Sequence, residues 1–335
     1  MSLKGAEDTA GAPQSAAGRE LVVVPGSVAN LGSGFDTLGV AVQIYLRARI
    51  VDVQHDDGSR LVVVRSEPPV RGGNAIERAF QALARRTGRS APTVFVEVDS
   101  DIPMAAGLGS SAAATVAGLR VFERITGPMP DQVLLGTATG CEGHADNAAP
   151  ALFGGLTSVV EREGHEPLVL RWRWPEELQM VVATPAMRLP TAKARAALAD
   201  VVPRRDAVFN LQRALAFVHA LQHGEFEMLR EAVRDRWHQP ARAALVPLLD
   251  EVLDIRDPDV LAAFLSGAGP SVALIARREH AQRVEQLLSA TYVRAGSEVR
   301  VRTFSVHQES DVMAAARLRQ GYGAQAGAAE RGRTV

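Results

Sequence analysis

Short apolar runs and helical patterns alternate along the chain, and their order predicts a mixed α and β protein. Runs rich in β-branched residues predict strands, and the expected strands cover residues 21–24, 45–53, 61–64, 94–98, 156–160, 168–170, 180–183, 264–266, 272–276 and 299–304. Apolar residues at helical spacing predict helices, which are expected at residues 74–87, 111–125, 131–142, 191–198, 208–223, 225–235 and 279–289. The strand, helix, strand order of the second half suits a small α+β sandwich.

The length of 335 residues predicts two compact domains, because a single hydrophobic core rarely grows that large. We expect an N-terminal domain over residues 20–174 and a C-terminal domain over residues 175–310, with the junction near Pro175. Residues 1–19 and 311–335 lack periodic apolar positions, so both are expected to be flexible extensions.

Composition narrows the kinds of partner. A formal net charge of -1 gives no long-range field for nucleic acid or an anionic membrane, so an anion must be held by local geometry. No apolar run reaches the roughly 20 residues that a membrane-spanning helix needs. Cys141 is the only cysteine, which rules out an intrachain disulfide and favours the cytoplasm. We expect a cytoplasmic protein with a small-molecule pocket and no nucleic-acid or membrane partner.

The glycine-rich segment at residues 103–113 is the most informative motif. Two glycines let backbone amides approach an anion, two serines follow, and a helix is predicted to begin at once with its free N–H groups facing that anion. The glycine spacing matches neither a Walker loop nor a dinucleotide fingerprint. The alternative is a turn in which Ser110 only caps the helix. We interpret the segment as a phosphate cradle made of Pro103, Met104, Ala105, Ala106, Gly107, Leu108, Gly109, Ser110, Ser111, Ala112 and Ala113.

A second segment, residues 25–36, mixes glycines with an amide and a carboxylate. The carboxylate of Asp36 suits a substrate ammonium group, and the amide of Asn30 can bridge a carboxylate and a hydroxyl. The alternative is a tight turn held by Asx hydrogen bonds.

A third segment, residues 142–147, begins with a carboxylate. Mg²⁺ takes oxygen ligands and needs only one or two carboxylates, so Glu142 is a candidate ligand. The alternatives are a solvated helix end for Glu142 and a structural role for His144. Zinc is disfavoured, because Cys141 and His144 lack the second ligand pair of a tetrahedral site.

The second half contributes a Gly-rich turn and two arginines. Backbone N–H groups of residues 266–271, with Gly267 and Gly269, are expected to face phosphate across a cleft; the alternative is a simple β-turn. The guanidinium groups of Arg195 and Arg242 suit a substrate carboxylate, and the alternative for each is a surface charge.

Taken together, these segments resemble the superfamily of galactokinase, homoserine kinase, mevalonate kinase and phosphomevalonate kinase. Its three motifs occur in order at residues 25–36, 103–113 and 266–271. Within that group the chain is most similar to the homoserine kinases, through residues 27–36, 142–155 and 191–195, and the resemblance covers about residues 21–307.

The resemblance implies an α+β fold of two domains, a ribosomal-protein-S5-like N-terminal domain and a ferredoxin-like C-terminal domain, with the active site and ATP in the cleft between them. It matches residues 103–113 to the triphosphate site and assigns magnesium to Ser111 and Glu142. The matching substrate-binding positions are Asn30, Asp36, His144, Asn147, Arg195 and Arg242. A homodimer is expected from the family alone.

Two positions bear on the chemistry. Ala145 stands where the family is expected to have proline, which affects the rigidity of the loop. Asn147 stands where some superfamily members place a catalytic Asp, and an amide cannot take a proton. The resemblance therefore implies catalysis by positioning and charge stabilisation, with Asn147 and Asp36 as catalytic residues and Asp36 or substrate phosphate as the proton acceptor.

The implied activity is transfer of the ATP γ-phosphate to homoserine on the route to threonine. One methylene separates homoserine from serine, and a pocket discriminates such a difference by only about 1 to 3 kcal/mol, so recognition of the amino and carboxyl groups is the firmer expectation. The alternatives are a kinase for another hydroxylated acid or mevalonate, a nucleotide-binding sensor without turnover, and a decarboxylase of phosphorylated mevalonate.

Overall fold

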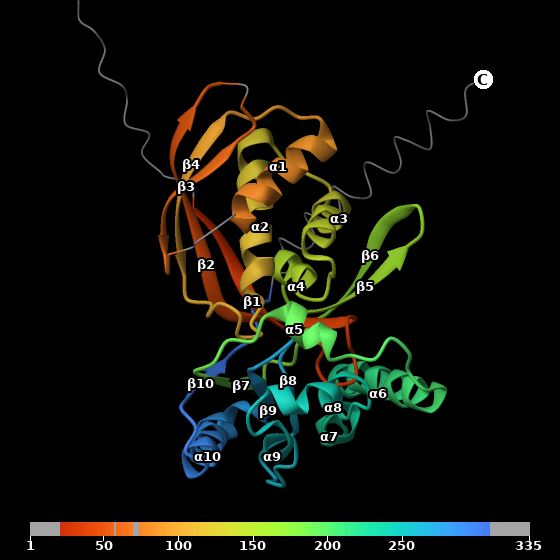
Figure 1. Ribbon diagram of the computed structural model, residues 1–335. Coiled ribbons are helices and arrows are strands. Elements are labelled where there is room, and N and C mark those ends of the chain that lie inside the picture. Colours follow the sequence, from red (N-terminus) through yellow and green to blue (C-terminus); the bar gives the residue numbers. More distant parts are fainter. Residues whose placement is uncertain (1–20, 57, 70–73, 309–335) are drawn as a thin grey trace, which may run out of the picture.

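The computed structural model describes residues 21–56, 58–69 and 74–308, and it contains two β-sheets with helices packed against each (Figure 1). The segments expected to be flexible, 1–19 and 311–335, lie outside the described residues. Among the residues described, no helix combines the length and the apolar character needed to cross a bilayer.

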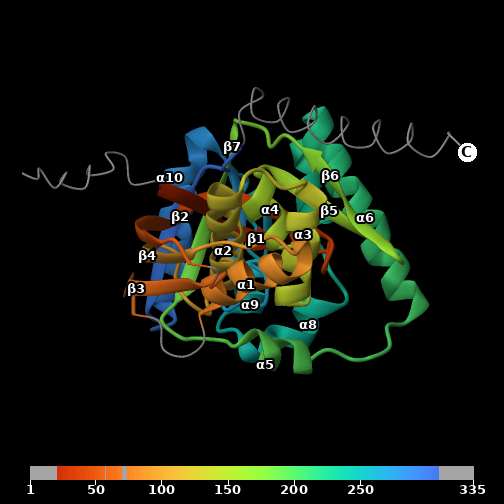
Figure 2. The ribbon, with the colours of Figure 1, turned by 90° about the horizontal axis from the view of Figure 1, so that it is seen from above.

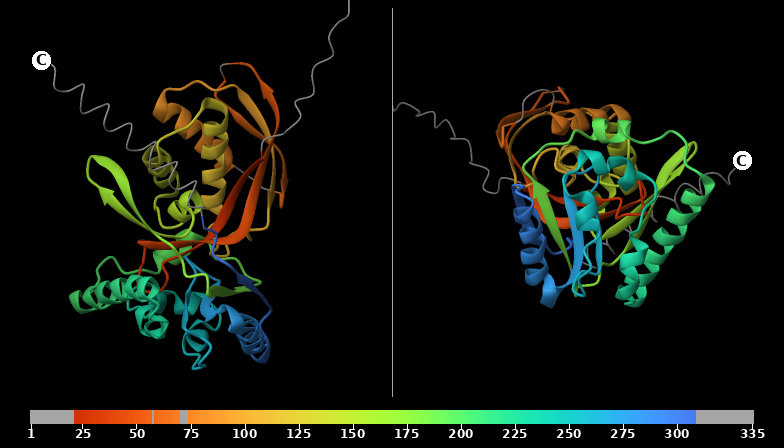
Figure 3. Two further views of the ribbon diagram at one scale, coloured as in Figure 1. Left: turned by 180° about the vertical axis from the view of Figure 1, so that it is seen from behind. Right: turned by 60° about the horizontal axis from the view of Figure 1, so that its bottom comes forward.

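The first sheet is formed by the N-terminal half of the chain. Its strands follow the order β3-β4-β2-β5-β6, with β1 paired to β2, and only β3 and β4 run parallel. The strands are β1 (Leu21–Ala29), β2 (Leu38–Gln54), β3 (Leu61–Glu67), β4 (Thr93–Ser100), β5 (Leu156–Arg162) and β6 (His165–Trp172). One face is covered by helices, as the view from behind shows (Figure 3, left): α1 (Ala75–Thr87), α2 (Ser110–Thr126), α3 (Asp131–Glu142) and α4 (Ala148–Phe153).

The second sheet is antiparallel and has the order β10-β7-β9-β8. Its strands are β7 (Leu178–Pro185), β8 (Ala262–Leu265), β9 (Val272–Arg277) and β10 (Val299–Phe304). The longer helices of this half are α6 (Arg204–His223) and α10 (Ala281–Arg294), which lie on opposite sides of it in Figure 2. The shorter ones are α5 (Thr191–Ala196), α7 (Leu229–Ala232), α8 (His238–Arg242) and α9 (Leu249–Leu253), with 3-10 turns at Phe226–Met228, Ala243–Leu245 and Arg278–His280.

A continuous apolar core joins the two halves and fixes their relative position. The rings of Phe80 on α1 and Phe122 on α2 meet edge to face with centroids 5.1 Å apart, in the centre of the first layer. The same core extends to Phe217, Leu221 and Phe264 of the second half, whereas a second cluster around Tyr292 fills the space between α10 and the second sheet. Close packing of this kind limits relative movement of the two halves, so a site built on both of them is held in place.

Several predicted boundaries differ from the structure. β1 continues to Ala29 instead of ending before Pro25, because the pairing with β2 shifts register between Pro25 and Gly26, and such a bulge accommodates a proline that cannot donate to the ladder. The helix predicted at 225–235 is broken into a 3-10 turn and the short α7. α4, α8 and α9 were not predicted, and each spans only five or six residues.

The chain returns to the first sheet after β10. The N–H of His307 donates to Ala41 O at 2.9 Å, and the N–H of Gly155 donates to His307 O at 2.8 Å. Val306 forms an isolated bridge with Val42. The last described residues therefore connect the second half to β2 of the first sheet and to Gly155.

Candidate active site

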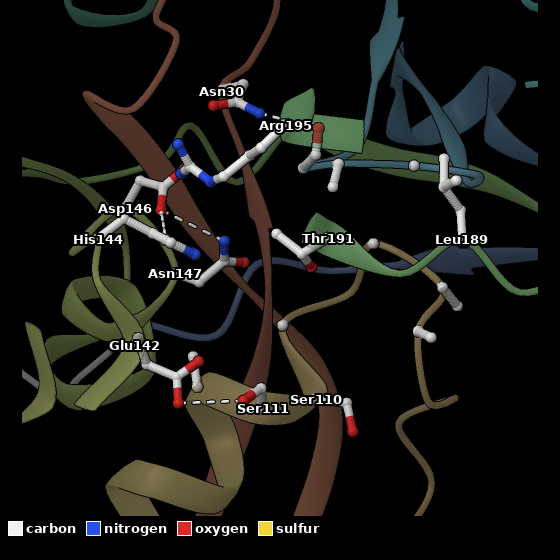
Figure 4. A pocket seen from close by; sticks show the side chains of 18 of the residues that line it. Asn30, Ser110, Ser111, Glu142, His144, Asp146, Asn147, Leu189, Thr191 and Arg195 are labelled. Carbon is white, nitrogen blue, oxygen red and sulfur yellow. Dashed lines mark hydrogen bonds and ion pairs between the residues drawn. The ribbon is translucent and has the colours of Figure 1, made fainter. Parts of the chain in front are cut away.

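A pocket between the two halves is lined by the sequence motifs, which come from six separate parts of the chain. The empty space of this pocket, counted together with the solvent at its open mouth, is about 680 Å³. Figure 4 shows Glu142 and Ser111 at one end of it and Asn30 and Arg195 at the other. The lining also includes Asp36, Ala105, Ala106, Gly107, Gly109, Ser110, Ala112, His144, Asp146, Asn147, Leu189, Thr191, Arg242, Gly267, Ala268 and Gly269.

The N-terminus of α2 opens into this pocket. The helix starts at Ser110 with Gly109 as its N-cap, in the left-handed conformation and without a capping side chain, so Ser110 is not the cap. The first turn also contains no acidic residue. Uncapped N–H groups and the positive end of the helix dipole therefore face the cavity, which is the arrangement that binds phosphate.

The two glycines of the loop are required by its packing. A Cβ at Gly107 would lie 2.3 Å from Ser266 O, and a Cβ at Gly109 would lie 2.1 Å from Ser27 Oγ. Both residues also have positive φ angles, +78° and +70°. The phosphate loop is thus pressed between β1 and the turn at 266–271, and it has no room for side chains at these two positions.

The turn at 266–271 holds the phosphate loop in place. The hydroxyl of Ser266 donates to Gly107 O at 2.6 Å. The N–H of Gly267 donates to Ala29 O at 3.1 Å, and the N–H of Gly269 donates to Ser266 O at 2.9 Å. The expectation that these two amides face phosphate is therefore wrong: both glycines lie in the pocket lining, but their N–H groups are used inside the protein.

Glu142 lies at the C-terminal end of α3, against the first turns of α2. One carboxylate oxygen, Oε1, accepts from Ser111 Oγ at 3.0 Å and from Thr115 Oγ1 at 2.5 Å. Thr115 is buried, and it was missed in the sequence although it lies one helical turn after Ser111 and so shares its face. Glu142 is thus a partly buried residue at the end of α3 whose carboxylate is held by two hydroxyl groups.

These oxygen atoms fit a magnesium ion. Two neighbouring ligands of octahedral Mg²⁺ lie about 3 Å apart when each is about 2.1 Å from the ion. Ser111 Oγ and Glu142 Oε1 are separated by 3.0 Å. No group of three or more His, Cys, Asp or Glu side chains suited to a metal occurs in the described part of the chain, so the remaining ligands would be water and phosphate oxygens.

His144, Asp146 and Asn147 form a connected group in the middle of the pocket (Figure 4). His144 Nδ1 and Asp146 Oδ1 are 2.6 Å apart, and Asn147 Nδ2 donates to the same oxygen at 3.4 Å. Asn147 Oδ1 accepts from Ser27 Oγ at 2.9 Å, which links the group to β1. Asp146 was not selected from the sequence, yet it is the buried carboxylate that orients the other two side chains.

The His144–Asp146 hydrogen bond raises the pKa of His144, more than burial lowers it. We therefore expect the protonated histidine to stabilise the folded protein below the ordinary histidine pKa of about 6.5, and this stabilisation to be lost as the pH rises through the raised pKa. The stability difference between the unmodified protein and His144→Gln should be largest at about pH 5.5 and should shrink towards pH 9, as measured by urea unfolding.

The exposed His165 on β6 provides the control, as His165→Gln, which removes an imidazole without removing a buried partner. A stability difference for His144→Gln that grows with pH would contradict the sign of this effect.

Asp36 and Arg195 pair with each other across the mouth of the pocket. Arg195 Nη1 donates to Asp36 Oδ2 at 2.9 Å and Nη2 donates to Asp36 Oδ1 at 2.8 Å, a bidentate pair, and both side chains are about one-third exposed. Asn30 lies beneath this pair: its Oδ1 accepts from the N–H of Asp36 and its Nδ2 donates to Gly267 O at 2.8 Å. Asn30 is thus engaged within the protein on both ends of its amide and joins the two halves.

Arg242 is a buried cation at the wall of the pocket, with 1% of its surface exposed. Nε donates to Ala194 O and Nη1 donates to Gly267 O and His238 Nδ1, each at 3.2 Å, and all three acceptors are neutral. Burial, and then the neighbouring Arg195, lower the pKa of Arg242. A surface charge is excluded, and a buried guanidinium without a bonded carboxylate favours an anionic ligand.

Comparison with known proteins agrees with this geometry. The family models for the GHMP kinase N-terminal domain and the GHMP kinase C-terminal domain match residues 74–155 and 217–294. These two family models and the two-domain α+β fold define the chain as one of the class of GHMP kinases.

Individual relatives assign the chain to one family within the GHMP kinases. The chain is 40% identical to a homoserine kinase of Thermus thermophilus over 80% of its own length and 90% of that protein, and 39% identical to the homoserine kinase of Deinococcus radiodurans over 75% and 82%. The crystal structure of homoserine kinase from Cytophaga hutchinsonii superposes with a TM-score of 0.77 at 26% identity, covering 88% of this chain and 97% of that one. The chain belongs to the homoserine kinase family of the GHMP kinases, as its motifs predicted.

Proposed function

We propose that this protein transfers the γ-phosphoryl group of ATP to the side-chain hydroxyl of L-homoserine and forms O-phospho-L-homoserine for threonine biosynthesis. The observation that carries the proposal is the layout of one pocket. An uncapped helix N-terminus with Ser111 and Glu142 lies at one end, and the charged groups of Asp36, Arg195 and Arg242 lie at the other. An anion fits the end with the helix N-terminus, and a zwitterion fits the end with the charged side chains. Membership of the homoserine kinase family supports this assignment.

The pocket and the family membership also support an assignment of the two domains. We assign the first sheet and its helices, within 20–174, to a ribosomal-protein-S5-like domain that binds ATP, and residues 175–310 to a ferredoxin-like domain. The active site is then the cleft between them. The return of residues 305–307 to the first sheet would restrict relative motion of the two domains at this end of the cleft.

ATP is the phosphoryl donor of this proposal. The amides at the start of α2 and of the loop at 103–109 would bind its phosphates, and the absence of an acidic residue from the first turn supports this. Ser111 and Glu142 would hold Mg²⁺, whose charge offsets that of the transferred phosphoryl group when it is bound. Thr115 fixes the carboxylate of Glu142, so the ligand is positioned before the ion arrives.

The amino-acid substrate would be recognised by its two charges. Its ammonium group suits Asp36, and its carboxylate suits Arg195 and the buried Arg242. Asp36 and Arg195 already form a bidentate pair. A zwitterionic substrate would replace this pair by two new ones, with its ammonium group on Asp36 and its carboxylate on Arg195, so the net charge would not change. Mevalonate has no ammonium group, so it would leave Asp36 without a new cation.

The chemical step needs alignment more than a base. The homoserine oxygen attacks the γ-phosphorus, the bond between that phosphorus and the bridging oxygen of ADP breaks, and the hydroxyl proton passes to an oxygen of the transferred phosphate. Asn147 cannot accept a proton, and in this proposal Asp36 is engaged by the ammonium group of the substrate. Both would act by positioning, and transferred phosphate is the proton acceptor that fits this site.

The test is a coupled assay of ATP consumption with Mg²⁺ and a panel of homoserine, serine, threonine and mevalonate, with the product identified by mass. We expect stimulation by homoserine above the other compounds and a product of the mass of O-phosphohomoserine. Preferred turnover of mevalonate, release of carbon dioxide from a phosphorylated mevalonate, or ATP binding without any turnover would each overturn the proposal.

A further inference from the structure

His238 is a fully buried histidine behind the wall of the pocket, and the chemistry above does not use it. It begins α8, the short helix that ends at Arg242, so the two side chains lie one helical turn apart on the same face. The imidazole also stacks on Phe35 with ring centroids 5.1 Å apart and an angle of 24°. The residue thus contacts both Arg242 and the segment that ends in Asp36.

The two hydrogen bonds of the imidazole define its protonation state. Nε2 lies 2.8 Å from Gly32 O, and a carbonyl oxygen only accepts, so Nε2 carries a proton. Nδ1 lies 3.2 Å from Arg242 Nη1, and a guanidinium only donates, so Nδ1 presents a lone pair. Both contacts are satisfied by one tautomer of the neutral ring, and a protonated ring would place a proton between Nδ1 and the guanidinium.

The charged groups around His238 are consistent with this neutral form. Burial lowers the pKa of His238, and Arg242 lowers it further, while Asp235 and Asp36 act in the opposite direction. The side chain of Asp235 is fully buried and lies 3.7 Å from Nε2. Its oxygens already accept the N–H groups of Trp237, His238 and Gln239 and the amide of Asn210, so its hydrogen-bonding capacity is used at the start of α8.

We propose that His238 is the positioning residue for Arg242, an acceptor that fixes the guanidinium while leaving its positive charge free for the substrate. With Nε on Ala194 O and Nη1 on His238 and Gly267 O, the plane of the guanidinium is fixed. None of these hydrogen bonds uses the third nitrogen, Nη2. The inference rests on the proposed function, in which Arg242 binds the carboxylate of the amino acid.

The type of acceptor matters as much as its position. A carboxylate at the place of His238 would bond Arg242 more strongly, but it would also neutralise the guanidinium and reduce its attraction for a second carboxylate. A neutral imidazole holds one edge of the guanidinium and leaves the net charge unchanged. The hydrogen bond to Gly32 keeps the acceptor nitrogen pointing at Arg242, and Gly32 has no space for a side chain, since a Cβ there would lie 2.0 Å from Val233 O.

Two substitutions separate the two hydrogen bonds of His238. In His238→Asn the amide oxygen falls near the place of Nδ1 and keeps the acceptor for Arg242, whereas in His238→Gln the longer side chain reaches towards Gly32 and removes that acceptor. We expect His238→Gln to raise KM for homoserine by about tenfold or more, the effect of losing a hydrogen bond to a charged group. KM for ATP should change little, and His238→Asn should recover most of the loss.

Stability is measured on both variants by thermal unfolding, because each loses part of a buried ring. A purely structural role predicts that KM for homoserine follows Tm, and equal increases in KM for both variants at equal Tm would overturn the proposal. Unchanged KM for homoserine in His238→Gln would also overturn it. If His238→Gln does not fold, His238→Met removes the same acceptor with an apolar side chain of similar length.

Arg242→Lys distinguishes a failure of this inference from a failure of the proposed function. If the unmodified protein does not phosphorylate homoserine, or if Arg242→Lys leaves KM for homoserine unchanged, the proposed function or its assignment of Arg242 is wrong. If Arg242→Lys raises this KM and His238→Gln does not, only the role of His238 fails. In the double variant, His238→Gln should add almost nothing to the effect of Arg242→Lys, because the acceptor acts through the guanidinium.

Discussion

Replacing Glu142 by glutamine is expected to lower kcat by about 100- to 1,000-fold, the range observed when one preorganised charge-stabilising group is removed from an active site. Glutamine keeps the size of the side chain and one carbonyl oxygen for Ser111 and Thr115, so the fold should be preserved. It loses the negative charge that Mg²⁺ requires. The Mg²⁺ concentration for half-maximal activity should therefore rise together with the fall in kcat, in assays of initial rate against Mg²⁺.

Two further variants make this result specific. Thr115→Val removes the hydroxyl that fixes Glu142 but leaves the carboxylate, so we expect a smaller loss of kcat and a partial increase in the Mg²⁺ requirement. Glu279→Gln changes an exposed carboxylate outside the pocket lining and should have no effect on either quantity. Normal turnover of Glu142→Gln at low Mg²⁺ would contradict the assignment of the metal ligand.

Gly107→Ala is expected to reduce kcat/KM for ATP by about 100-fold, as a displacement of about 1 Å in a catalytic loop can do. The physical cause is a clash between the phosphate loop and the turn at 266–271. The new Cβ would lie 2.3 Å from Ser266 O and 3.0 Å from Gly269 O, so the phosphate loop and the turn at 266–271 must separate. This also weakens the hydrogen bond from Ser266 Oγ to Gly107 O. Steady-state kinetics with ATP and a thermal melt measure the two effects.

Gly88→Ala is the matched control for backbone strain. Gly88 follows α1 with a φ of +65°, close to the +78° of Gly107, but a Cβ there meets nothing within 4 Å. Alanine at Gly88 should cost about 1 to 2 kcal/mol of stability, the effect of a left-handed non-glycine residue, and leave the kinetics unchanged. If Gly107→Ala behaves like Gly88→Ala, the contact between the two loops does not position the phosphate site.

The helices and strands of this protein were largely predictable from the sequence, and so was the place of the glycine-rich loop before α2, which lines the pocket. Periodic apolar positions located α1, α2, α3 and α10, because each has three or more turns with one buried face. Glycines followed by serines before a helix predicted a phosphate-binding loop at residues 103–113, because the features of such a loop are local in the sequence. Glu142 and Arg195 were selected because their side-chain types suit the ligands, and Ser111 was assigned to magnesium through the family resemblance.

The partners of these residues could not be predicted, because they lie far apart in the chain. Asn30 and Gly267 are 237 positions apart and hydrogen-bonded, and no local pattern links them. Pairing likewise changed the interpretation of Asp36 and Arg195, which bind each other, and of Gly267 and Gly269, whose amides are used inside the protein. His238 gave no signal at all, since a buried histidine is defined by its neighbours.

By itself, the sequence determined the order of elements, the class of chemistry and the residue types that perform it, because backbone conformation and helix-terminus electrostatics depend on neighbours in the chain. Only the tertiary structure decided which hydroxyl fixes Glu142, which neutral acceptor orients Arg242, and why Gly107 has no side chain. These depend on contacts between elements, and such contacts arise only when the two halves pack on a common core.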